Sequence, residues 1–331
     1  MRDTYSQYLT PRRRDFIRVL CAGTVAAGVP LAYAQEAYPS RPVTLIIPWP
    51  AGANSDVAAR AFAQGMSKYL KQTVIPENVP GAGGTLGPAR MARSNKPDGY
   101  TLSQIPGGIF RQPAMRKTDW DPQKDFSYIS RIGAYQVAIV VDANSPFKTL
   151  DDIIAYAKTH PGEVTYGSSG IATANHLGIA AVALQARVEL THVPFKGSAE
   201  SLTALMGGHV MLASSDSAGS YIDSGKMRAL AVCGDTRVSR WPNVPTLIEL
   251  GYNVTSNSPY GLAGPAGMDP KMVAYLDGIT KQVTEDPEFI AAMARFDHTV
   301  SYLNTADYKV SIQRELADSK RLIEALGLVE K

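Results

Sequence analysis

Apolar and polar residues alternate along this chain in a pattern that predicts short strands followed by amphipathic helices. The first strand is predicted at 43–49, and a helix follows from about 56 to 71, with apolar side chains gathered on one face at Ala58, Phe62, Met66 and Tyr69. A second strand at 73–79 leads into a helix over about 85–93. Alternation of this kind is typical of α/β folds built on open, largely parallel sheets.

The same alternation continues to the C-terminus. Further strands are expected at 100–106, 137–142, 164–167, 188–195, 209–213 and 228–234, and further helices over 175–186, 199–206 and much of 270–326. Thr149 is expected to cap another helix, because Asp152 three residues later completes a capping box. Two strand–helix blocks joined by two crossings predict two Rossmann-like lobes with a ligand cleft between them. The first lobe would hold residues 35–136 with 258–331, and the second would hold 137–257.

The N-terminal segment has the pattern of an export signal. A basic stretch at 12–18 precedes a short apolar stretch at 19–31 and the small-residue cleavage pattern Ala32-Tyr33-Ala34. We therefore expect residues 1–34 to be a signal peptide that is removed near Ala34, and the mature protein to be periplasmic. Arg13-Arg14 followed by Asp, Phe and Ile favours a twin-arginine signal, while an ordinary secretory signal stays open.

Charge and cysteine content narrow the range of partners. The chain carries 33 basic and 30 acidic side chains, and the predicted leader alone contains the excess of three positive charges. A mature protein near neutrality offers no basic surface for nucleic acid. Cys233 is the only cysteine of the mature chain, which excludes an intramolecular disulfide, and its apolar setting predicts a core residue.

Two loops rich in glycine are the most informative feature for function. Residues 49–56 and 81–87 each follow a strand and open a helix, so their amide groups can hold an anionic group. The same residues would also serve as helix caps and tight turns. Asp56 would repel an anion unless its side chain turns back onto its own loop. The ligand-binding candidates in these two loops are Trp49, Gly52, Ala53, Asn54, Ser55, Gly83, Gly84 and Thr85.

A further group of candidates lies in the predicted second lobe. Ligands of open α/β sheets bind beyond the carboxyl ends of the strands, where loops of both lobes can converge. Serine and threonine hydroxyls there can both donate and accept hydrogen bonds. The candidates are Ser168, Ser169, Thr173, His176, Phe195, Ser215 and Asp216. Trp49, Phe195 and Tyr260 stand at strand ends, where they would either wall the cleft or belong to the core.

The chain lacks the signatures of common catalytic and metal sites. The motifs GxSxG, HExxH and CxxC are absent, and the five histidines show no close metal-ligand spacing. We therefore expect no catalytic residues, no metal and no cofactor. The rival hypothesis is a secreted α/β hydrolase that uses Ser169 with His176 and Asp216, although no nucleophile elbow supports it.

Several longer motifs, taken in order, resemble one known family. They are ENVPGAGGTLG with the later PDGYTL, YGSSGIATANHL, THVPFKGSAESLTALMGGHV, SGKMRALAV with WPNVPTLIELGY, and YGLAGPAGM. Over residues 41–331 the chain resembles the Bug-type receptors of tripartite tricarboxylate transporters, which are periplasmic solute-binding proteins of the type II, bilobed architecture. The resemblance implies a carboxylate-bearing solute between the lobes and delivery to a membrane permease with one large and one small subunit.

Two segments that face the ligand in this family depart from its pattern, so the resemblance does not carry the identity of the ligand. The first loop has Trp49 and Asn54 where members commonly have a phenylalanine and glycines. The segment after the strand at 209–213 is shorter and carries Ser214, Ser215 and Asp216.

The expected function is therefore capture of a mono- or dicarboxylate for uptake. An aromatic diacid such as a phthalate and small aliphatic diacids both stay open. No arginine stands in the candidate loops, so we expect neutral dipoles and bound water to hold the carboxylate. The expected partners are this small molecule and the permease subunits, with no nucleic acid, and the receptor is expected to be a monomer. Delivery to a membrane sensor kinase instead of a transporter stays open.

Overall fold

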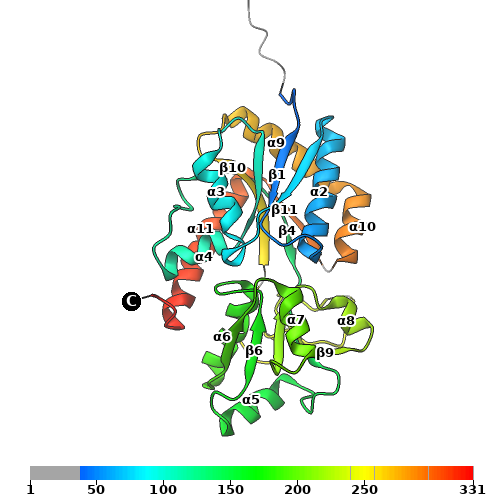
Figure 1. The fold of residues 1–331 in the computed structure, drawn as a ribbon, viewed down its shortest axis with the longest axis vertical. Helices are drawn as coiled ribbons and strands as arrows, with labels where there is room; N and C mark the ends of the chain where they lie inside the picture. The colour runs from blue at the N-terminus through cyan, green and yellow to red at the C-terminus, as the bar shows by residue number, and fades with distance from the viewer. Residues whose placement is uncertain (1–37, 239, 257, 297, 331) are drawn as a thin grey trace, which may run out of the picture. The chain divides into compact units, whose positions relative to one another are not determined.

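The computed structural model describes residues 38–238, 240–256, 258–296 and 298–330. The strands form two separate sheets, one of six strands and one of five (Figure 1). We call the six-stranded sheet with its helices lobe 1 and the five-stranded sheet with its helices lobe 2. The predicted leader, residues 1–34, lies outside the described residues. Within the described part of the chain, no helix combines the length and the apolar character that a membrane span requires.

The sheet of lobe 1 is mixed. Its order is β11 (His298–Leu303), β4 (Phe126–Tyr135), β10 (Ser258–Pro265), β3 (Thr101–Pro106), β1 (Val43–Ile47) and β2 (Val74–Asn78). β1 runs parallel to β2 and β3, whereas β10 runs antiparallel to both β3 and β4. The carboxyl ends of β1, β2 and β3 therefore meet at one edge, where the loops that follow them gather.

Helices of lobe 1 come from both ends of the chain. They are α2 (Asn54–Leu70), the 3₁₀ turn η1 (Ala82–Gly84), α3 (Leu86–Ser94), α4 (Gly108–Met115), α9 (Pro270–Glu285), α10 (Pro287–Arg295) and α11 (Thr305–Ala325). One core cluster joins Ile105 of β3, Ile109 of α4 and Ile312 of α11. The C-terminal helix is thereby packed against α4, which follows β3 and begins at the edge described above.

The sheet of lobe 2 follows the order β7 (Thr191–Pro194), β6 (Thr165–Ser168), β8 (Leu212–Ser215), β5 (Ala138–Asp142) and β9 (Met227–Val232). Its helices are α5 (Leu150–Thr159), α6 (Ala174–Ala186), α7 (Ser198–Met206) and α8 (Gly219–Asp223). β6 runs parallel to β7 and β8, so the ends of β6 and β8 lie at the same edge. Only two residues separate the end of β4 in lobe 1 from the start of β5.

Strand β5 shows how the sequence pattern buries both faces of this sheet. Ile139 and Val141 belong to the core cluster beneath α5 and α6, whereas Ala138 and Val140 belong to the cluster beneath α7. Successive side chains of a strand point to opposite faces, so a continuous apolar run requires cover on both sides. The strand predicted at 137–142 is confirmed, and it lies between β8 and β9 in the sheet.

The predicted fold class is confirmed, with three differences. The sheets are mixed rather than parallel, because β10 and β5 enter antiparallel to their neighbours. The prediction omitted the strands β4, β10 and β11, and it also omitted the helices α4 and α8. Helix α4 is short, contains Pro113 and buries the polar side chains of Arg111 and Gln112, features that do not indicate a helix in the sequence. The predicted capping box is confirmed, since Thr149 accepts from the Asp152 amide while the Asp152 carboxylate accepts from the Thr149 amide.

Candidate ligand-binding site

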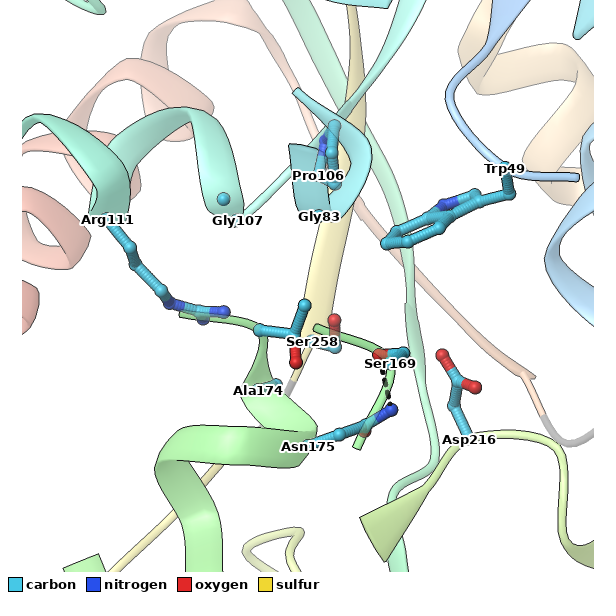
Figure 2. A pocket seen from close by; sticks show the side chains of 12 residues that line it. Trp49, Gly83, Pro106, Gly107, Arg111, Ser169, Ala174, Asn175, Asp216 and Ser258 are labelled. Atoms are coloured by element: carbon cyan, nitrogen blue, oxygen red, sulfur yellow. Dashed lines mark hydrogen bonds between the residues drawn. The ribbon is translucent and has the colours of Figure 1, made fainter. Parts of the chain in front are cut away.

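Loops from both lobes line a small, partly open cavity of about 10 Å³, which is room for about one water molecule (Figure 2). Most of its walls follow the carboxyl end of a strand, as in open α/β sheets generally. Lobe 1 supplies residues after β1, β2 and β3, and lobe 2 supplies residues after β6 and β8. The lining residues are Trp49, Gly83, Pro106, Gly107, Gly108, Arg111, Ser169, Thr173, Ala174, Asn175, Asp216 and Ser258.

Arg111 brings a positive charge to the cavity from the first turns of α4. Its side chain is only 7% exposed, and Nη2 donates to Oε1 of Glu315 in α11 over 2.6 Å. A Cβ on Gly107 would stand 2.8 Å from the guanidinium carbon, so the glycine makes room for this side chain. The expectation of neutral dipoles rested on loops without arginine, and it missed Arg111. A third strand–glycine–helix pattern, IPGGIF at 105–110, was the signal that could have led to it.

Asp216 brings a carboxylate to the opposite wall from the end of β8. Its Oδ1 accepts hydrogen bonds from the hydroxyls of Ser198 and Ser217. Burial raises the pKa of Asp216 above its ordinary value, although these hydrogen bonds act in the other direction. Beside it, Nδ2 of Asn175 donates to Oγ of Ser169 over 2.8 Å (Figure 2).

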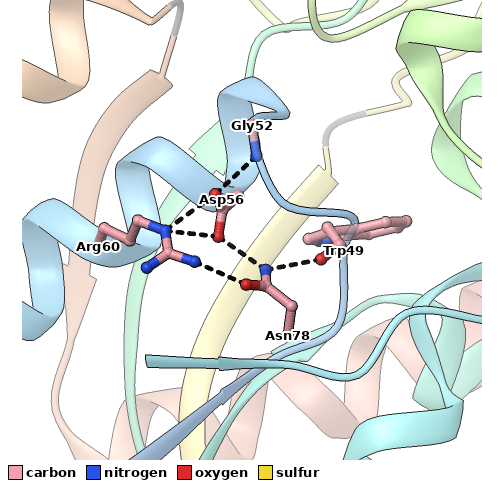
Figure 3. A network of polar contacts seen from close by, with 5 residues as sticks. All are labelled: Trp49, Gly52, Asp56, Arg60 and Asn78. Atoms are coloured by element: carbon pink, nitrogen blue, oxygen red, sulfur yellow. Dashed lines mark hydrogen bonds and ion pairs between the residues drawn. The ribbon is translucent and has the colours of Figure 1, made fainter. Parts of the chain in front are cut away.

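The first glycine loop is held by its own aspartate rather than left open. Asp56 accepts from the Gly52 amide at 2.8 Å, from Nε of Arg60 at 3.0 Å and from Nδ2 of Asn78 at 2.7 Å (Figure 3). The same Asn78 amide donates to the carbonyl oxygen of Trp49. Burial alone would raise the pKa of Asp56, but these hydrogen bonds outweigh it and hold the pKa below its ordinary value. The carboxylate therefore turns inward, the condition under which this loop could face an anion.

This network changes the list of candidates from the first loop. The Gly52 amide is occupied by Asp56, and the Ala53 amide donates to the carbonyl of Pro50. Asn54 and Ser55 form the first turn of α2 and stand outside the cavity lining. Of the candidates in this loop, Trp49 alone lines the cavity.

The second glycine loop contributes one residue to the lining. Gly83 takes the left-handed conformation, with φ of 64°, and faces the carbonyl of Ile171 in lobe 2. Gly84 packs against the Trp49 ring instead, and its amide donates to Gly81. Thr85 is fully buried, and its hydroxyl donates to the carbonyl of Ala82. Gly83 therefore lines the cavity, whereas its neighbours Gly84 and Thr85 bond within the turn.

Candidates in lobe 2 also divide into two groups. Ser169, Thr173 and Asp216 line the cavity, whereas Ser168, His176, Phe195 and Ser215 stand outside the lining. The Ser168 hydroxyl forms a hydrogen bond with Nε2 of His192 at 2.7 Å and accepts another from the Gly170 amide of its own loop. His176 lies stacked on His192, with ring centroids 3.9 Å apart, and its Nδ1 accepts from the Ala172 amide.

The remaining candidates serve packing and local hydrogen bonds. Phe195 packs on a core cluster of lobe 2, and the Ser215 hydroxyl accepts from the Ser217 amide. Tyr260 is buried and stacks on Tyr135, with ring centroids 4.5 Å apart. Of the three aromatic residues considered as cleft walls, only Trp49 lines the cavity.

The residues of the rival hydrolase hypothesis do not assemble into a relay. The Ser169 hydroxyl pairs with Asn175, His176 Nδ1 accepts from a backbone amide, and Asp216 accepts from serine hydroxyls. A nucleophile requires a base within hydrogen-bonding reach, and the base needs an orienting partner. Among the residues that the structure describes, no three His, Cys, Asp or Glu side chains converge in a way that could hold a metal ion.

Known proteins resemble this chain in sequence and in fold. Residues 58–328 match the family model described as tripartite tricarboxylate transporter family receptor. The UPF0065 protein in the gbd 5' region of Cupriavidus necator is 42% identical over 325 residues, which cover 96% of this chain and 99% of that protein.

Solved structures show the same fold. The periplasmic binding protein BugD is 28% identical with a TM-score of 0.82, covering 89% of this chain and 100% of that one. An R. palustris protein solved with adipate is 25% identical with a TM-score of 0.82, covering 88% of this chain and 98% of that one.

Proposed function

Because this chain belongs to the tripartite tricarboxylate transporter receptor family, we propose that it is a non-catalytic receptor for a small carboxylate. The observation that carries the proposal is the convergence of Arg111 from lobe 1 and the Ser169 loop from lobe 2 on one cavity. Hydrogen bonds to a charged group contribute about 1.5–3 kcal/mol each. A guanidinium with two or three hydroxyl or amide donors can therefore support micromolar affinity, about −8 kcal/mol.

Binding in this proposal is coupled to movement of the lobes. The cavity has room for about one water molecule, so a carboxylate of several carbons enters only when the loops separate. We place the lobe boundaries where the chain crosses, after residue 136 and after residue 257. The ligand then shifts an open–closed equilibrium, since it contacts both lobes only in the closed form.

We favour an aliphatic ligand over an aromatic one. Phe195 is half-buried against a core cluster of lobe 2 and Tyr260 is buried, and neither belongs to the lining, which leaves Trp49 as its aromatic side chain. A single ring on one wall offers less stacking surface than a flat aromatic diacid would use. The adipate in the R. palustris relative is also an aliphatic diacid.

Export and delivery complete the proposal. Relatives of this chain are periplasmic binding proteins, and we propose that this chain reaches the same compartment after removal of residues 1–34. There the loaded, closed form would be recognised by the membrane subunits of a tripartite transporter, whose receptors define the family.

Calorimetry on the chain from Gln35 onward tests the proposal. Titration with aliphatic and aromatic mono- and dicarboxylates should give micromolar dissociation constants for at least one acid, with the acid recovered intact by mass spectrometry. Binding confined to sugars or uncharged amides would refute carboxylate capture. Chemical turnover of the bound acid would instead support the hydrolase.

A further inference from the structure

The two charged side chains of the cavity lining stand on opposite lobes. Arg111 belongs to lobe 1 and Asp216 to lobe 2. Arg111 is already paired with Glu315 at 2.6 Å, so much of its charge is neutralised before a ligand arrives. Asp216 takes its hydrogen bonds from serine hydroxyls and forms no ion pair among the described residues. A plain dicarboxylate would therefore bring two more negative charges to a site whose own charges already sum to minus one.

Two hydrogen-bonded paths in lobe 2, through Ser198 and Ser217, end on Asp216. Nδ2 of Asn175 donates to the hydroxyls of Ser169 and Ser198, and the Ser198 hydroxyl donates onward to Oδ1 of Asp216. The Ser217 hydroxyl donates to the same Oδ1. The Asn175 amide hydrogens and the Ser198 hydroxyl proton therefore already have acceptors within the protein and are not available to a ligand. An ionised carboxylate can only accept hydrogen bonds, so Asp216 faces the cavity as an acceptor.

The Asp216 carboxylate is also placed where it can accept a hydrogen bond from a ligand in the cavity. Figure 2 shows it extending from the end of β8 into the cavity, toward Trp49 and beside Ser169. Both serine hydroxyls bond to Oδ1, which leaves Oδ2 for a group that enters the cavity. The Arg111 guanidinium thus lies on the lobe 1 side, and on the lobe 2 side the Asp216 acceptor stands beside the Ser169 hydroxyl, which accepts from Asn175 and can still donate its own proton.

We propose that Asp216 selects for a carboxylate ligand that also carries a hydrogen-bond donor, an ammonium or a hydroxyl group, in preference to an unsubstituted dicarboxylate. The inference rests on the proposed function and names the ligand class of the same site. The ligand carboxylate faces Arg111 and the glycine loop, while its ammonium or hydroxyl donates to Oδ2 of Asp216. A ligand without that donor leaves the carboxylate desolvated and unpaired.

Two matched series of acids test the inference on the chain from Gln35 onward. One series is succinate, malate and aspartate, and the other is adipate, 2-hydroxyadipate and 2-aminoadipate. Within each series the acids differ only in a hydrogen, hydroxyl or ammonium group. In at least one series, the acid with a donor should bind about ten- to hundredfold more tightly than the unsubstituted diacid. Comparing the malate and aspartate arms separates a hydroxyl ligand from an ammonium ligand.

Asp216→Asn supplies the second readout. The amide has the same shape but donates as well as accepts, so preference should shift at least tenfold toward the unsubstituted diacid. Asp151→Asn, an exposed substitution on α5, should leave the preference unchanged. Thermal midpoints of the unliganded variants identify any variant that has failed to fold. Should Asp216→Asn be unfolded, the wild-type ratios alone decide.

The outcomes separate this inference from the proposed function. Equal or tighter binding of the unsubstituted diacids by the wild type, or equal weakening of all acids by Asp216→Asn, overturns the role of Asp216 and leaves carboxylate capture intact. Absence of binding by any acid of either series, and by the wider panel of carboxylates, overturns carboxylate capture itself.

Discussion

Trp49 donates its indole N–H to the hydroxyl of Tyr135 across 3.2 Å. Trp49 lines the cavity, and Tyr135 is the last residue of β4, where the chain leaves lobe 1. The same hydroxyl accepts from Nε2 of Gln104 at 2.8 Å, and the Tyr135 ring stacks on Tyr260 of β10, the strand that returns to lobe 1. Through Tyr135, Trp49 is therefore connected to the strands at both crossings between the lobes, by a hydrogen bond to β4 and by ring stacking to β10.

Removing the indole N–H should weaken ligand binding through this connection. Trp49→Phe keeps an aromatic ring on the wall but loses a hydrogen bond worth about 1 kcal/mol, so affinity should fall about fivefold. Trp120→Phe is the matched control, since Trp120 donates to the Ile109 carbonyl and is not part of the lining. It should lower the thermal midpoint while leaving the dissociation constant unchanged. Equal effects of both variants on affinity would contradict the connection.

Neutralising Glu315 should strengthen carboxylate binding. Glu315→Gln keeps the shape of the side chain and an oxygen that can accept from Arg111, but it removes the charge that offsets the guanidinium. Calorimetry should show a three- to tenfold lower dissociation constant, with a loss of about 1 kcal/mol in stability from the weakened pair. Glu324→Gln, on the exposed side of the same helix, should change neither value appreciably. Unchanged or weaker binding in Glu315→Gln would show that Arg111 does not face the ligand charge.

The regular parts of the fold were predictable because their causes are local. Continuous apolar runs identified β1 and β5, and the Thr149–Asp152 capping box located the start of α5. Strand β4 was missed because its requirements are long-range. At Gly133, a Cβ would stand 2.4 Å from the Thr299 carbonyl, so the glycine is required by the close approach of β11. No local pattern in the sequence indicates that approach.

The site was predictable to the extent that backbone loops determine it. Glycine-rich loops after strands led to Trp49 and Gly83, and the serine-rich loop led to Ser169 and Thr173. Arg111 was missed because the direction of its side chain depends on Glu315, which lies 204 residues later. In the first loop, local partners occupy the amides of Gly52 and Ala53, whereas Asn78, 22 residues after Asp56, binds the Asp56 carboxylate from the next strand.

The stacked side chains of His176 and His192 should make the folded protein less stable below neutral pH. Burial lowers the pKa of His176 to about 3, with the adjacent His192 contributing, and burial lowers the pKa of His192 to about 4. Both values lie below the value of about 6.5 in the unfolded chain, so the unfolded state binds more protons as pH falls below 6.5. Each histidine should then reduce the free energy of unfolding by about 1.4 kcal/mol per pH unit until its folded-state pKa is reached.

Urea unfolding at pH 7, 6 and 5 measures this slope in a range where most carboxylates remain ionised. His192→Gln should reduce the slope by about one proton relative to the wild type. His209→Gln, at an exposed position, should retain the full slope. Stability that is constant between pH 7 and 5 would contradict burial of these histidines in the neutral form.

Adding one methyl group at Gly83 should oppose closure of the lobes. A Cβ on Gly83 would stand 3.2 Å from the Ile171 carbonyl and 3.7 Å from the Thr173 methyl group, both in lobe 2. Gly52 is the matched control, because it also has a positive φ, of 83°, but a Cβ there meets nothing within 4 Å. Both alanine variants should lose about 1 kcal/mol of stability from backbone strain. Only Gly83→Ala should also weaken ligand binding, by at least tenfold, because the closed form alone brings Ile171 against this position.

Calorimetry measures the dissociation constants of both variants, and urea unfolding measures their stabilities. If Gly83→Ala bound its ligand as tightly as Gly52→Ala, binding would not require the approach of the two loops seen here.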